Sequence, residues 1–179
     1  MTRALLRARL SEASFTETFP ALRRRLSVGT DFFQCCPILS NANKMVYLDE
    51  VFYYYRKTEG SIIHSFNKNF VYSLKQGHLR LVECAKQWEY DIPDLDKKLA
   101  NRYMLTSSTI AFKGRLLKKR RDIYDHVKSI GDDELFIKSY RGADLKNLNV
   151  YRKIIVKLLI HKQYWLLALL LPGFKGYGM

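Results

Sequence analysis

The spacing of apolar residues changes near residue 67. Before this point, residues 44–48 and 51–55 are rich in β-branched and aromatic side chains, and two acidic residues separate them. Such enrichment is typical of buried strands, and an acidic pair between two such runs is typical of a turn. The pattern therefore predicts a pair of strands near residues 45–55.

After residue 67 the strand signals fade and apolar positions recur with the period of an α-helix. The helical pattern is interrupted at Pro93, Gly114 and Gly131. The predicted helices cover about residues 67–89, 94–113, 115–129 and 132–141. The sequence thus predicts an α/β portion followed by a mainly α-helical C-terminal subdomain.

Residues 150–171 mix apolar and basic side chains and end in eight consecutive apolar residues before a Pro-Gly pair. Because a spanning helix needs about 20 apolar residues, this pattern predicts a helix that lies in the membrane interface. The residues expected to contact an anionic membrane are Arg152, Lys153, Lys157, Lys162 and Trp165. The alternative is a buried helix that packs on the helices of residues 67–141.

The net charge of the chain limits the classes of partner that it is expected to bind. It carries 31 Lys and Arg against 17 Asp and Glu, which gives a formal net charge of +14. Its 47% hydrophobic content predicts a folded body, so the charge must lie largely on the surface. Anionic phospholipids, nucleotide diphosphates and nucleic acids are all compatible with such a surface.

Cysteine usage and the first residues favour the cytoplasm. Cys35 and Cys36 are adjacent and Cys84 stands alone, so neither a disulfide framework nor a Cys-x-x-Cys spacing is present. Arg7 and Arg9 interrupt the apolar residues near Met1, and a signal peptide is therefore not expected.

The region before residue 67 carries an ordered set of motifs. Thr30 and Asp31 begin a predicted helix, the predicted strand pair ends in Tyr-Tyr-Tyr-Arg56, and a loop with Gly60 and Ser61 follows. This order resembles the bacterial family 2 glycosyltransferases, which are inverting enzymes of GT-A type that build capsules, lipopolysaccharide and exopolysaccharide. The resemblance covers about residues 1–70, and the helical remainder fits the variable C-terminal extension of such enzymes.

The resemblance implies that Asp31 is the general base. In an inverting transfer, a carboxylate removes the proton from the acceptor hydroxyl as its oxygen attacks the anomeric carbon of a nucleotide sugar. The family usually has Glu-Asp at this place, and Thr30 replaces the Glu here. The structural alternative for Asp31 is a helix N-cap, which is compatible with the catalytic role.

The resemblance also suggests contacts to the donor. Arg56 and Ser61 match residues that lie near the donor diphosphate in the family, and a guanidinium suits paired phosphate oxygens. The alternative is an exposed arginine at a strand end and a loop serine. His64 is a further possible ligand, although a lone histidine after a strand is more often a surface residue.

The nucleotide-binding half of such an enzyme is missing from this sequence. In the family that half ends in an Asp-x-Asp that holds Mg²⁺ or Mn²⁺ on the nucleotide sugar. Asp94 and Asp96 form a literal Asp-x-Asp, but they follow Pro93 and are expected to cap a helix. We therefore expect no metal site or other cofactor in this chain, and a truncated gene product or a fragment of a longer enzyme.

These expectations divide the chain into part of a GT-A-like core (residues 1–66), a helical extension (67–149) and a membrane-facing tail (150–179). The implied function is the transfer of a sugar to a polysaccharide or lipid-linked acceptor at the inner face of the cell membrane. A non-catalytic membrane-associated scaffold is the alternative. A nucleic-acid-binding module is less favoured, because basic runs at residues 23–25 and 113–121 lack any supporting signature.

Overall fold

The helical half of the protein dominates the computed structural model. The structure describes Cys35, Lys44, residues 46–50, Tyr54, residues 65–87 and residues 92–173. Within residues 65–87 and 92–173 the α-helices are α3 (Phe70–Gln87), α4 (Leu95–Phe112), α5 (Arg120–Gly131), α6 (Glu134–Gly142), α7 (Val150–Ile160) and α8 (Tyr164–Leu170). Three 3₁₀ turns connect or extend them: η2 (Lys113–Leu116), η3 (Leu145–Asn147) and η4 (Leu171–Gly173).

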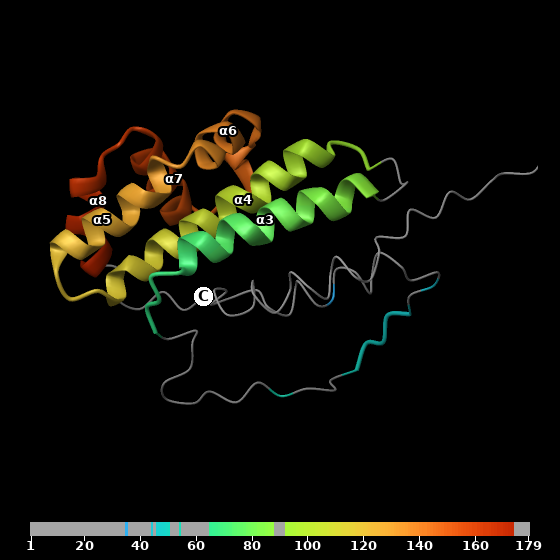
Figure 1. Ribbon diagram of the computed structural model, residues 1–179, viewed down its shortest axis with the longest axis horizontal. Helices are drawn as coiled ribbons and strands as arrows, with labels where there is room; N and C mark the ends of the chain where they lie inside the picture. The colour runs from blue at the N-terminus through green and yellow to red at the C-terminus, as the bar shows by residue number, and fades with distance from the viewer. Residues whose placement is uncertain are drawn as a thin grey trace, which may run out of the picture.

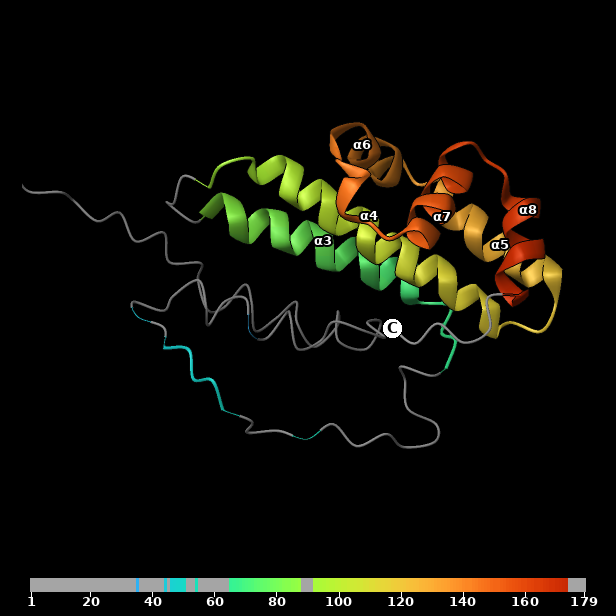
Figure 2. The ribbon, with the colours of Figure 1, turned by 180° about the vertical axis from the view of Figure 1, so that it is seen from behind.

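Helix α4 lies at the centre of the bundle and packs against α3, α5, α6 and α7 (Figure 1). Helix α8 packs on α5 and α7 at one end of the bundle, which the opposite view confirms (Figure 2). One continuous hydrophobic core joins these helices. It includes Phe70 of α3, Met104 of α4, Phe136 of α6, Val156 of α7 and Leu167 of α8.

The helix boundaries follow from local chemistry. Asp133 caps α6 by accepting a hydrogen bond from the N–H of Leu135, and Asn149 caps α7 in the same way through the N–H of Arg152. Asp94 occupies the N-cap position of α4, as predicted, but its side chain makes no capping hydrogen bond. The helices predicted from about residues 94, 132 and 150 are confirmed to within two residues at their starts, and α3 begins three residues after its predicted start. The helix predicted from about residue 115 begins only at Arg120, because residues 113–116 form the 3₁₀ turn η2.

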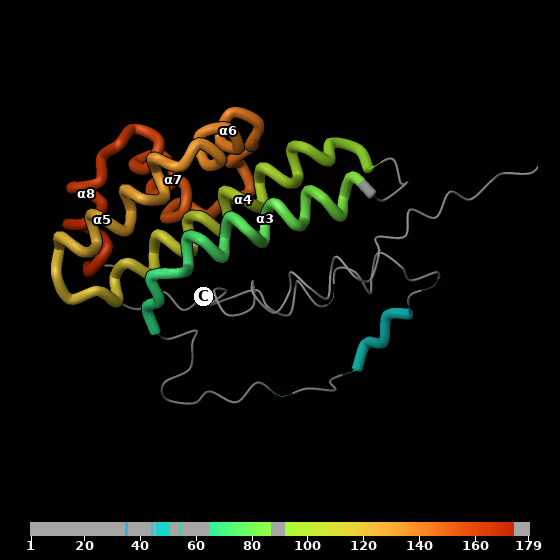
Figure 3. The backbone as a smooth tube through the Cα atoms, in the orientation of Figure 1, coloured from blue at the N-terminus to red at the C-terminus, as the bar shows by residue number. Residues whose placement is uncertain are grey.

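The predicted strand pair is wrong. Lys44, residues 46–50 and Tyr54 contain no strand, and the remaining described residues contain no sheet. Figure 3 shows the backbone of residues 46–50 as a short, separate length of tube. The side chains of Val46, Tyr47 and Leu48 are exposed, so the β-branched and aromatic residues here are not buried as strand residues would be. For the described residues, the predicted α/β remnant of a GT-A core is therefore corrected to a mainly helical fold.

The segment predicted as one helix over residues 150–171 forms two. The N–H of Gln163 donates to the carbonyl of Leu158 at 2.8 Å, and the N–H of Lys162 donates to the carbonyl of Leu159 at 3.1 Å. These two bonds form a Schellman motif, with Lys162 in the left-handed region at φ 57°. The chain therefore turns after α7 and sends α8 back along α5.

The fold predicts that two leucines of α8 contribute very differently to the free energy of unfolding. Leu167 has no exposed surface, whereas Leu169 is 55% exposed. We expect Leu167→Ala to lower the free energy of unfolding by about 2 to 5 kcal/mol through loss of packing, and Leu169→Ala to change it by less than about 0.5 kcal/mol. Urea denaturation of both variants checks this. Equal losses would show that α8 does not pack in the described orientation.

Candidate functional site

Helix α8 is apolar on both faces. One face, made by Tyr164, Leu167 and Ala168, is buried in the core and continues into Leu171 of η4. The opposite face is exposed and consists of Trp165, Leu166, Leu169 and Leu170, which we call the α8 patch. A helix that is apolar all round is usually covered on all sides. The α8 patch is therefore a candidate interaction surface.

The position of α8 depends on its contacts with the C-terminal end of α5 and with η2, which precedes α5. At one end, the Tyr164 hydroxyl donates to Asp132 Oδ1 at 2.7 Å, and the ring lies so close to Gly131 that a Cβ there would be 2.6 Å from Tyr164 Cε1. At the other end, Leu171 lies against Gly114, which precedes α5. Helix α8 thus runs antiparallel to α5 with little freedom to rotate.

A row of ring contacts links the α8 patch to a basic side chain on α5. The rings of Trp165 and Tyr124 have centroids 4.7 Å apart, and Tyr124 also meets Tyr164 edge to face at 6.0 Å. The guanidinium of Arg121 lies 5.8 Å from the centroid of the Tyr124 ring. Aromatic rings with a polar edge and an adjacent cation are typical of surfaces at a membrane–water boundary.

The environment of Tyr164 keeps its hydroxyl protonated. Burial raises the pKa of Tyr164 well above its ordinary value, and the carboxylate of Asp132 raises that pKa further by hydrogen bonding and charge. Lys162 Nζ lies 3.7 Å from the same carboxylate. The Tyr164 hydroxyl therefore stays protonated, and able to donate to Asp132, further into the alkaline range than an ordinary tyrosine would.

The predicted tail residues have different environments. Trp165 is exposed, as a membrane-contacting residue must be. Lys153 Nζ donates to the carbonyl of Lys146 at 2.9 Å, and Lys162 pairs with Asp132. Lys157 is exposed on α7, whereas Arg152 is only partly exposed. Two of the four predicted headgroup ligands thus already contact groups of the protein itself.

The predicted catalytic and donor-binding residues lie outside the described residues. These residues are Thr30, Asp31, Arg56, Ser61 and His64. Within the part of the chain that the structure describes, no three His, Cys, Asp or Glu side chains are grouped as metal ligands would be.

Two polar side chains that the sequence did not single out, His126 and Lys75, have structural roles. His126 Nε2 lies 2.9 Å from the carbonyl oxygen of Ile110, and burial lowers the pKa of His126, so the neutral ring can donate this bond. The Phe66 ring packs edge-on against it at 4.9 Å. Lys75 Nζ pairs with Asp133 at 2.8 Å and ties α3 to the start of α6. These contacts fix the bundle and leave the α8 patch as the candidate site.

Comparison with protein-family models, with curated proteins and with solved structures finds no match to this chain. None of the helices in the described ranges combines the length and the apolar character needed to cross a bilayer.

Proposed function

We propose that this chain is a peripheral membrane protein of cell-surface glycan synthesis. In this proposal the bundle of residues 65–173 attaches to the cytoplasmic face of the membrane. The segment that resembles a family 2 glycosyltransferase then meets a lipid-linked or polysaccharide acceptor there. The observation that supports attachment is the α8 patch, which presents four large apolar side chains to solvent on a helix whose other face is in the core.

Two properties of α8 favour attachment: the apolar area of its exposed patch, and its fixed position in the folded bundle. Burying a large apolar side chain fully contributes about 1.5 to 3 kcal/mol, and the α8 patch offers one tryptophan and three leucines, each only partly exposed. A peptide that folds on the membrane loses conformational entropy as it binds, whereas α8 is already held by Asp132 and Gly131. The patch can therefore enter the acyl boundary without a folding step.

The catalytic part of the proposal rests on the sequence motifs. Asp31 serves as the general base toward the acceptor hydroxyl, and Arg56 and Ser61 contact the donor diphosphate. A nucleotide-binding half, carrying the nucleotide sugar with Mg²⁺ or Mn²⁺, has to be supplied in addition to these residues.

A non-catalytic membrane-associated scaffold is the second candidate function. It is favoured by one observation: the described residues between 44 and 54 contain no strand, although the glycosyltransferase resemblance places a strand pair there. Donor binding distinguishes the two, because a scaffold has no need of a nucleotide sugar.

Removing the apolar patch is expected to weaken membrane binding. Leu166→Ser and Leu169→Ser together remove two exposed leucines, and we expect partition onto phosphatidylserine-containing vesicles to fall by about tenfold or more. Leu79→Ser, which changes an exposed leucine of α3, is the matched control and leaves binding unchanged. Co-sedimentation with vesicles measures all three proteins. Undiminished binding of the double variant would contradict attachment through α8.

The catalytic hypothesis makes a separate prediction. In a protein joined to a nucleotide-sugar-binding half, we expect Asp31→Asn to lower kcat by a factor on the order of 10² to 10⁴ and to leave donor affinity largely unchanged. The reason is that the amide keeps the shape of the side chain but cannot accept the acceptor proton. Steady-state kinetics measure this, and normal turnover in the variant would remove Asp31 from the mechanism.

A further inference from the structure

Four consecutive basic residues lie at the start of α5. Lys118, Lys119, Arg120 and Arg121 are all exposed, and this is the unfavourable end of a helix for cations, because the helix dipole is positive there. Local helix stability therefore gives no reason for this run of charges. An anionic partner would stabilise them.

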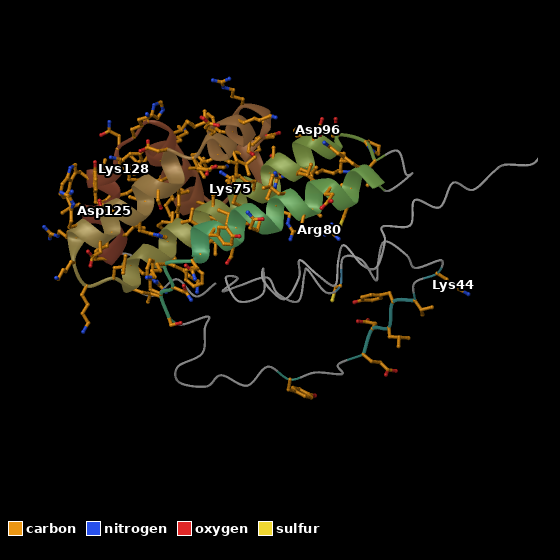
Figure 4. All side chains as sticks on the ribbon, in the orientation of Figure 1. Lys44, Lys75, Arg80, Asp96, Asp125 and Lys128 are labelled. Carbon is orange, nitrogen blue, oxygen red and sulfur yellow. The ribbon has the colours of Figure 1, made fainter. Side chains whose placement is uncertain are left out.

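Two acidic residues follow this run, and they do not neutralise it. Arg121 Nε lies 3.5 Å from Asp125 Oδ2, and both side chains are more than half exposed. Exposed pairs of this kind contribute little and exchange readily for another anion. Asp122 is also exposed. Lys128, one helical turn beyond Tyr124 on α5, adds a fifth basic side chain (Figure 4).

The packing of α8 places its apolar patch beside this basic run. Leu171 lies against Gly114, so the end of α8 that carries Leu169 and Leu170 approaches the residues just before α5. Farther along, Trp165 stacks on Tyr124, and Tyr124 lies beneath Arg121. An apolar surface and a set of cations therefore meet along one pair of helices.

We propose that α5 and α8 together form one surface that binds an anionic phospholipid bilayer, with Lys118, Lys119 and Arg121 contacting lipid phosphates while the α8 patch enters the acyl boundary. This inference rests on the proposed function and deepens it, because it identifies the cations of the contact. They lie at and just before the start of α5, whereas the sequence pattern places them at Arg152, Lys153, Lys157 and Lys162. The guanidinium of Arg121 lies over the ring of Tyr124, and that ring contacts Trp165 of the α8 patch.

A bilayer is the occupant that uses both halves of this surface. Anionic headgroups complement the basic run, and the acyl boundary directly beneath them complements the leucines and Trp165. A nucleic acid would satisfy the cations but leave the three leucines of the α8 patch in water. An apolar protein partner would cover the leucines and leave the cations unpaired.

The test compares two triple variants that remove the same charge. The α5 triple replaces three basic residues at the start of α5 and combines Lys118→Gln, Lys119→Gln and Arg121→Gln. The α7 triple replaces three basic residues of α7 and combines Arg152→Gln, Lys153→Gln and Lys157→Gln. Each basic side chain near an anionic surface contributes about 1 kcal/mol, or about fivefold in partition, so we expect the α5 triple to lose on the order of 100-fold in binding to phosphatidylserine vesicles. The α7 triple loses less than about threefold, and thermal unfolding shows both triples folded.

The outcomes separate this inference from the proposed function. If the α7 triple loses as much binding as the α5 triple or more, the cations are misassigned, although membrane attachment stands. If the unaltered protein binds no vesicles, both proposals fail. Salt-sensitive binding of RNA through Lys118–Arg121, with no binding to anionic vesicles, would also overturn the inference. The inference is supported if the α5 triple still binds phosphatidylcholine vesicles weakly, and as well as the unaltered protein does.

Discussion

The contact between α8 and α5 is the constraint on which the account depends. Tyr164 fits against Gly131 and donates to Asp132, while Leu167 and Leu171 fill the core from the same side. Because these contacts occupy one face of α8, the opposite face must point outward. Its composition then decides what the protein presents to its surroundings, and that composition is wholly apolar. A single packing arrangement thus links core stability to the surface through which we propose membrane attachment.

Much of the helical half could be predicted from the sequence, since apolar periodicity and the breaks near Pro93 and Gly131 lie within short windows of the chain. The division of residues 150–171 could not, because the turn uses Lys162 at positive φ where glycine is the usual signal. The strand pair was wrong for a related reason. Aromatic and β-branched residues favour strands only when a neighbouring strand is present to accept their backbone hydrogen bonds.

The candidate site was partly predictable. The apolar run with Trp165 indicated a membrane contact, and its exposure agrees with that role. The sequence pattern places the cations at Arg152, Lys153, Lys157 and Lys162, which are close to Trp165 along the chain. The structure brings Tyr124, about 40 residues away, beside Trp165, and Arg121 lies over the Tyr124 ring. Periodicity within one segment carries no information about which other helix packs against it. Asp31 and the donor-binding residues stay predictions from motif order.

The central claim is that the exposed face of α8 enters the membrane while the bundle stays folded. Trp88→Phe leaves Trp165 as the sole tryptophan, so its fluorescence reports on α8 alone. On addition of phosphatidylserine vesicles, the account predicts a blue shift of the Trp165 emission and quenching by lipids brominated on their acyl chains, with an unchanged helical circular dichroism signal. Vesicle-bound protein whose Trp165 emission stays unshifted and is not quenched by those lipids would contradict it.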